Sequence, residues 1–202
     1  TVQDIESKSH AGLEAVLSSC AFVGFADPVF VLLQHQTRLY LCNVRVLCEE
    51  LLRQQVFMRF SNFDRIALQE PVPLRAMLEQ ASRLVREKHA QAYVDEGGRV
   101  APPWTADACM EALMRMREML AEYFCIEITA DARVAALPCL VDGHAPDLAF
   151  LPLFFYFLAA EVNWQLENEC FHGIARQLAR FYVPRPPLLE EPLRLLVLPI
   201  PF

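Results

Sequence analysis

The clearest pattern of apolar and polar residues in this chain lies within residues 22–60 and predicts a hairpin followed by a helix. Short apolar runs rich in β-branched and large side chains are typical of strands. Asp27-Pro28 predicts a turn between the first two runs, because proline fixes φ and lacks an N–H. The residues Gln34–Arg38 form a polar patch between the second and third runs. The three predicted strands are Phe22–Phe25, Val29–Leu33 and Leu39–Cys42.

A helix is predicted after the hairpin, with Asn43 placed to cap it. Apolar residues recur there every four positions, which indicates one buried helical face. We expect this face to pack on the sheet of the hairpin. The face consists of Cys48, Leu52, Val56 and Phe60, with Leu47 and Leu51 beside it.

Similar patterns predict the elements of the remaining chain. Thr105 is placed to cap a helix with Asp107 in its first turn, where the helix dipole favours an acidic residue. Pro152 suits the first turn of another helix. Helical stripes are predicted at Leu74–Val85, Cys109–Phe124, Leu153–Val162 and Gln165–Tyr182, and strands at Phe124–Thr129 and Arg133–Leu137. Irregular segments are expected at Ser61–Val72, at Arg86–Trp104 and in the tail from Val183.

Composition narrows the classes of function. The 202-residue chain is 54% hydrophobic and 21% charged, so it can form a hydrophobic core. Its net charge of −7 argues against direct binding to the phosphate backbone of a nucleic acid, which needs clustered lysine and arginine. Seven scattered cysteines without a CxxC pair indicate a reduced intracellular protein. The longest apolar run, Leu148–Ala160, is too short to span a bilayer, so we expect a buried helix and no membrane contact.

The segment Phe22–Leu51, FVGFADPVFVLLQHQTRLYLCNVRVLCEEL, resembles the C-terminal domain of the MutL mismatch-repair family. Within that family it is most similar to the shared subunit of the eukaryotic MutL heterodimers. Polar residues such as Gln34 and His35 match as well as apolar ones, and the resemblance covers most of residues 13–182. It continues in Phe60–Leu74, Arg117–Ile128, Leu137–Asp142 and Ala159–Phe171.

The resemblance implies an α+β fold with two lobes, each built from a small sheet packed with helices. A dimerisation lobe, residues 1–64 and 144–202, would be interrupted by an external lobe, residues 65–143. The residues by themselves would also permit two consecutive domains.

Nuclease-active MutL relatives carry the motif Asp-Gln-His-Ala-x-x-Glu at the position of the hairpin. Here Gln34 and His35 match that motif, whereas Leu33 and Leu39 replace its two carboxylates. Hard divalent cations prefer carboxylate oxygen, and metal-activated water needs the cation. We therefore expect no catalytic residue, metal or cofactor in this domain, and a hydrogen-bonded structural or interface role for His35.

Other residues that could carry chemistry show no recognisable signature. The sequence holds no P-loop, GxGxxG or GxSxG motif. Its cysteines and histidines match no compact zinc spacing, and Trp164 and the methionines of residues 110–119 are expected to pack. The candidate zinc ligands are Cys125, Cys139, Cys170 and His172.

The favoured hypothesis is an interaction module, because surplus apolar surface is typical of obligate interfaces. The resemblance implies a nuclear mismatch-repair protein that pairs with a PMS-type paralogue as a heterodimer, with a homodimer as the alternative for the isolated chain. It also implies docking of short peptide motifs from an exonuclease and other repair factors, without direct DNA binding. By resemblance, the partner interface includes Gln34, Leu41, Phe57 and Ile66.

Two other classes stay open. A divergent metal-dependent nicking endonuclease would act as a homodimer, and binding of manganese or zinc would reveal it. A generic α/β ligand-binding domain would be a stable monomer with a saturable small-molecule site.

Overall fold

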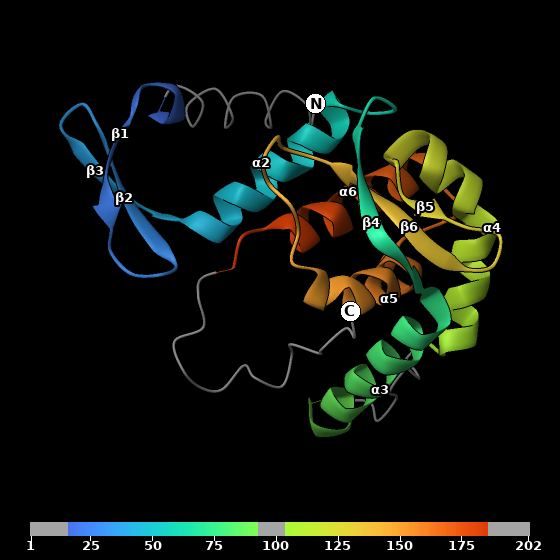
Figure 1. Cartoon of the computed structure of the whole chain (residues 1–202). Helices are drawn as coiled ribbons and strands as arrows, with labels where there is room; N and C mark the ends of the chain where they lie inside the picture. Colours follow the sequence, from blue (N-terminus) through green and yellow to red (C-terminus); the bar gives the residue numbers. More distant parts are fainter. Residues whose placement is uncertain (1–15, 93–103, 186–202) are drawn as a thin grey trace. The chain divides into compact units, whose positions relative to one another are not determined.

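The computed structural model describes residues 16–92 and 104–185, which form an α+β fold with two small antiparallel sheets (Figure 1). The α+β prediction is therefore confirmed. Contacts divide the chain into two compact units: one runs to Cys48, and the other extends from Glu49 to Pro184. Residues 1–15 and most of the predicted irregular tail, from residue 186 onward, lie outside the described residues.

The first unit contains the predicted hairpin sheet, formed by β1 (Ala21–Phe25), β2 (Phe30–His35) and β3 (Arg38–Asn43) in the order β1-β2-β3. The turn at Asp27 forms as expected, because its carboxylate accepts hydrogen bonds at 2.7 Å from the N–H groups of both Val29 and Phe30. Gln36 takes a left-handed conformation, with φ of 54°, in the second turn. The sequence therefore located all three strands and both turns.

The register of this sheet decides which side chains share a face. Leu32 lies opposite Leu41, whereas its neighbour Leu33 lies opposite Tyr40. Side chains alternate between the two faces along a strand, so the two leucines point to opposite sides. Val31 and Leu33, which share one face, are both buried.

Helix α2 (Val44–Met58) follows the hairpin and begins as predicted, since the Val46 N–H donates to the Asn43 side chain at 3.2 Å. Leu52 and Val56 are buried, whereas Leu51 is exposed and Phe60 lies beyond the end of the helix. The predicted buried face is therefore correct for Leu52 and Val56 and wrong for Leu51 and Phe60.

The expected packing of this helix on the hairpin sheet also needs correction for residues 49–58. Their described contacts include helix α6 (Glu167–Tyr182): Arg180 donates to Glu49 at 3.2 Å, and the Phe57 ring lies 4.9 Å from that of His172. This part of α2 belongs to the second unit.

The second unit holds a sheet of β4 (Asp64–Pro73), β6 (Arg133–Cys139) and β5 (Glu127–Ile128), in the order β4-β6-β5. Strand β4 was not predicted, because its two prolines and many exposed side chains resemble a loop. Proline is tolerated there because β4 is an edge strand. The predicted strand from Phe124 shortens to β5, because α4 continues to Phe124 and Cys125 ends it with φ of 53°.

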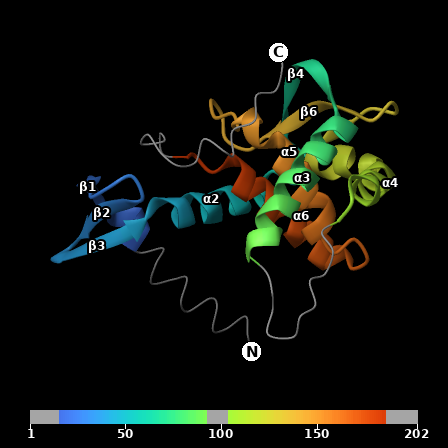
Figure 2. The same ribbon diagram turned by 90° about the horizontal axis from the view of Figure 1, so that it is seen from below.

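Helix α5 (Leu151–Glu161) is the centre of the second unit (Figure 2). It packs against α3 (Leu74–Ala92), α4 (Ala106–Phe124) and α6. A short 3₁₀ helix, Leu148–Phe150, leads into it, and Pro152 lies in its first turn as predicted. Its fully or largely buried side chains are Leu151, Pro152, Phe154, Phe155, Tyr156, Leu158 and Ala159.

Helices α3 and α4 follow their predicted patterns closely. The α3 stripe is buried from Leu74 to Val85, and the Ala108 N–H donates to the Thr105 hydroxyl at 3.2 Å. The loop predicted at Arg86–Trp104 is wrong for residues 86–92, which are helical, and residues 93–103 lie outside the described part. Arg86 and Glu87 continue an exposed helical face instead of ending the helix.

The division into lobes at residues 64 and 144 stays a prediction. Within the described residues, no helix is both long enough and apolar enough to cross a membrane.

The burial of α2 predicts a sharp contrast between two adjacent leucines. Leu52 is 3% exposed and Leu51 is 52% exposed. Leu52→Ala should lower the free energy of unfolding by about 2–5 kcal/mol, because it leaves a cavity. Leu51→Ala should change it by no more than about 0.5 kcal/mol. Urea unfolding of both variants measures this, and equal losses would show that the buried face is misassigned.

Candidate partner-binding surfaces

Exposed apolar side chains are concentrated in the hairpin unit. Of the thirteen large apolar side chains exposed among the described residues, eight belong to this unit, although it is much the smaller of the two. Apolar surface gathered in one region marks an interaction site more often than scattered apolar residues do. The eight are Leu17, Phe22, Val23, Phe25, Val29, Leu39, Leu41 and Val46.

One face of the hairpin sheet, here called the covered face, is covered in part. Val31 and Leu33 on it are buried, whereas Phe25 and Phe22, which lie opposite them on β1, are 68% and 60% exposed. Residues 16–19 are helical, and Ser19 Oγ lies 3.1 Å from His35 Nδ1, within hydrogen-bond distance. His35 shares its face with the buried side chains of Val31 and Leu33. The expected hydrogen bond of His35 is therefore present, and its structural or interface role stays a prediction.

The opposite face, formed by Leu32, Gln34, Leu39 and Leu41, is here called the open face. Leu39 and Leu41 are each 60% exposed. Gly24 lies opposite Leu32, and a Cβ added there would meet nothing within 4 Å. Within residues 16–48, the described neighbours therefore leave this apolar face uncovered.

The predicted interface residues fall into two groups. Gln34 and Leu41 lie together on the open face. In the second unit, Phe57 is half-buried, with the guanidinium of Arg53 5.9 Å from its ring centre, and Ile66 is half-buried on β4. The structure brings the first two together and places the other two on separate elements, α2 and β4.

The hairpin also separates the two positions that carry carboxylates in nuclease-active relatives. Leu33 lies on the covered face, opposite Tyr40, whereas Leu39 lies on the open face, opposite Gln34. Among residues 16–92 and 104–185, no three His, Cys, Asp or Glu side chains are grouped so that they could share a metal. The expected absence of a metal and cofactor stays a prediction.

The candidate zinc ligands on α6 do not converge. Cys170 is buried and His172 is exposed, since residues two apart lie on different sides of a helix. Burial raises the pKa of the Cys170 and Cys125 thiols above the ordinary value of a thiol.

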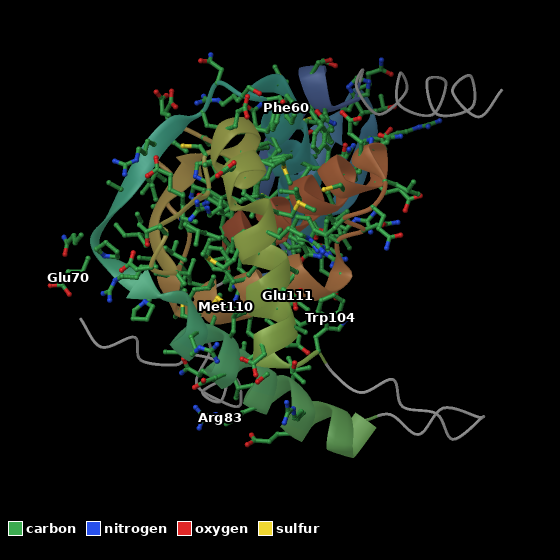
Figure 3. The ribbon with its side chains drawn as sticks, turned by 90° about the vertical axis from the view of Figure 1, so that its right-hand side faces the viewer. Phe60, Glu70, Arg83, Trp104, Met110 and Glu111 are labelled. Carbon is green, nitrogen blue, oxygen red and sulfur yellow. The ribbon has the colours of Figure 1, made fainter. Side chains whose placement is uncertain are left out.

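A second candidate surface is a hollow of about 420 Å³ in the second unit, here called the aromatic hollow. Its walls are held by ring contacts: Phe60 lies 5.5 Å from Tyr123 and 5.2 Å from Phe171 between ring centres. Figure 3 labels Phe60. The Trp164 indole N–H donates to the Ala159 carbonyl at 3.0 Å, which fixes a further wall. The lining residues are Phe60, Met116, Met119, Tyr123, Trp164, Gln165, Glu167, Cys170 and Phe171.

Sequence reasoning missed the aromatic hollow. Its residues come from the end of α2, from α4 and from the α5–α6 connection and α6, so no local pattern joins them. Met116 and Trp164 were expected only to pack, and both also line this hollow.

An α+β domain with an open apolar sheet face, two leucines in place of paired carboxylates and an aromatic hollow has the character of a protein-interaction domain. Residues 1–194 match the family described as DNA mismatch repair protein Mlh1 C-terminus. The chain belongs to this family, which confirms the resemblance to the MutL C-terminal domain.

Three curated relatives are similar over nearly the whole chain. "DNA mismatch repair protein Mlh1" of Dictyostelium discoideum is 31% identical over 189 residues, which are 94% of this chain and 21% of the relative. "DNA mismatch repair protein MLH1" of Saccharomyces cerevisiae is 27% identical, covering 90% of this chain and 24% of its own length. "Putative MutL protein homolog 1" of Schizosaccharomyces pombe is 26% identical, covering 94% of this chain and 26% of its own length. The chain thus spans about a quarter of the length of these relatives.

Proposed function

We propose that this domain holds a second MutL-type subunit through the open face of the hairpin, and that it acts in DNA mismatch repair. The observation that carries the proposal is the 60% exposure of Leu39 and Leu41 on one sheet face. Covering apolar surface is favourable by about 25 cal/mol per Å², so a partner that covers this face gains free energy. Obligate interfaces are similarly hydrophobic and resemble a protein core that is divided between two subunits.

The edge of the sheet supports the same assignment. Strand β3 carries Leu39 and Leu41 and is an outer strand in the order β1-β2-β3. An outer strand presents N–H and C=O groups that a partner can pair with. A partner that approaches the open face at β3 would therefore meet apolar side chains and hydrogen-bonding groups together.

The partner in this proposal is a PMS-type MutL paralogue, and the complex acts in the nucleus. Membership in the Mlh1 C-terminal family supports a MutL-type partner. Phe57 and Ile66, both half-buried in the second unit, are proposed as further partner contacts on the basis of the resemblance. A homodimer is the alternative assembly when the chain is alone.

The domain is proposed to act without an enzymatic site of its own. Support comes from Leu33 and Leu39, which stand in the two positions that carry carboxylates in nuclease-active relatives. Direct DNA binding by this domain is not proposed, because its net charge is −7.

We further propose that the aromatic hollow docks short peptide motifs of other repair factors, an exonuclease among them. Rigid aromatic walls are suited to holding an apolar side chain of a peptide, and methionine adapts to its shape. Glu167 at the same hollow can pair with a basic residue of the peptide.

The pairing proposal predicts that a charge on the interface weakens the heterodimer. Leu41→Asp and Phe57→Asp should each reduce affinity for the C-terminal domain of a PMS-type paralogue at least about tenfold, because an unpaired charge would be desolvated. Glu49→Lys should weaken it less. Isothermal titration calorimetry measures the affinities.

A matched control for that experiment is Leu166→Asp, which places the same charge at a leucine that is 54% exposed in the second unit. It is better matched than Glu49→Lys, since Glu49 accepts a hydrogen bond from Arg180. Circular dichroism must show that each variant is folded. Wild-type affinity in folded Leu41→Asp and Phe57→Asp would refute the assigned surface.

The proposal that this domain acts without an enzymatic site predicts that the isolated domain does not nick supercoiled DNA in the presence of manganese. Agarose electrophoresis after incubation measures nicking, with His35→Ala as the control. Nicking that co-purifies with the wild-type chain and disappears in His35→Ala would favour the endonuclease alternative.

The docking proposal predicts that overlapping peptides covering the exonuclease partner include one that binds the aromatic hollow. Met119→Asp should weaken its binding at least about tenfold, whereas Met114→Asp should not. Both methionines are half-buried on α4, but only Met119 lines the hollow. Fluorescence polarisation measures the difference, and equal losses in the two variants would exclude this hollow as the docking site.

A further inference from the structure

A hollow of about 500 Å³ lies in the second unit beside α3 and the first turn of α4, and is here called the arginine hollow. It contains three arginines in a chain that has 18 basic and 25 acidic residues, so it departs locally from the overall acidic charge. Figure 3 labels Arg83 on α3 and Trp104 just before α4. The lining residues are Arg75, Glu79, Ser82, Arg83, Arg86, Thr105, Ala106 and Asp107.

Only one of the three arginines is neutralised inside the hollow. Arg75 donates to the Asp107 carboxylate at 2.8 Å and lies 3.9 Å from that of Glu79. Arg83 donates through Nε to the backbone carbonyl of Glu79 at 3.4 Å, which leaves its charge uncompensated. Within the described residues, neither Arg83 nor Arg86 has a carboxylate at salt-bridge distance.

The two uncompensated guanidinium groups are positioned to act together. Arg83 and Arg86 are three residues apart on α3, and both line the hollow, so they lie on one helical face. Ser82 also lines the hollow; it is 4% exposed, and its hydroxyl donates to the Glu79 carbonyl at 3.1 Å. Its oxygen can still accept a hydrogen bond.

We propose that the arginine hollow binds the phosphate group of a phosphorylated serine or threonine in a partner protein. A phosphate carries between one and two negative charges at neutral pH and three acceptor oxygens, which suits two guanidinium groups. A carboxylate has one charge and is satisfied by a single arginine, as Asp107 is by Arg75. This binding site shares no residue with the open face or the aromatic hollow.

A protein phosphate fits the hollow better than a nucleic acid does. Nucleic-acid grooves need basic residues that follow the strand over several phosphates. Here the hollow also contains Glu79 and Asp107, and the chain carries a net charge of −7. A single phosphate meets Arg83 and Arg86, whereas its neighbours in a strand would meet acidic surface.

The test uses the whole 202-residue chain labelled with ¹⁵N and a pentapeptide with phosphoserine between glycines. NMR titration should show saturable shifts of the arginine Nε–H signals of Arg83 and Arg86. The same peptide with unmodified serine should produce none. Equal shifts with both peptides would overturn the proposal.

Two variants with the same change in charge decide whether the hollow is responsible. Arg83→Gln combined with Arg86→Gln should weaken phosphopeptide binding at least about tenfold. Arg115→Gln combined with Arg176→Gln, at exposed arginines outside the hollow, should leave it within about twofold. Circular dichroism must show both double variants folded.

Equal weakening in the two double variants would overturn the proposal, because it would mean a general charge effect. Displacement of the phosphopeptide by oligothymidylate at a lower concentration than unlabelled phosphopeptide needs would also overturn it, in favour of a nucleic-acid site.

Discussion

The burial of most of helix α5 is the constraint on which the second unit depends. Seven of its 11 residues are buried and nearly all are apolar, so water must be excluded from most of its surface, and α3, α4 and α6 do this. Hydrogen bonds then fix the end of α6: the Tyr182 hydroxyl donates to the Pro138 carbonyl, and His144 Nε2 lies 2.7 Å from the Tyr182 carbonyl oxygen. This packed unit gives rigid walls to both hollows, because each is lined by helices of the same core.

In the hairpin unit, by contrast, apolar side chains stay exposed on the sheet. A three-stranded sheet has two faces, and here both carry apolar side chains. The short helix at residues 16–19 lies on one face, near His35, while Leu39 and Leu41 stay exposed on the other. Apolar side chains in a small sheet normally need a second layer. The proposed partner subunit would supply this layer and would account for leucine at positions where water favours polar residues.

Sequence patterns predicted the elements whose signals are local. The Asn43 cap, the Thr105 cap and the α3 stripe each depend on residues within a few positions, and each is present. Strand β4 was missed because its edge position, which lets it contain proline, is a property of the assembled sheet. Phe60 was assigned to a helical stripe, yet α2 ends before it and it packs on aromatic rings from α4 and α6 instead.

The candidate surfaces likewise depend on properties of the assembled fold that no local sequence pattern shows. Gln34 and Leu41 came from a resemblance, and only the strand register shows that they share an uncovered face. The two hollows join residues distant in the chain, so no spacing could indicate them. Local chemistry can be read along a sequence, whereas a surface depends on which segments the core brings together.

The most direct test of the central claim is the mass of the complex in solution. The 23.1-kDa chain is mixed with the C-terminal domain of a PMS-type paralogue, and sedimentation equilibrium measures the mass. A 1:1 complex with the summed mass of the two chains is the predicted result. A chain that stays at 23.1 kDa, alone and with every MutL paralogue of its organism, would contradict the account.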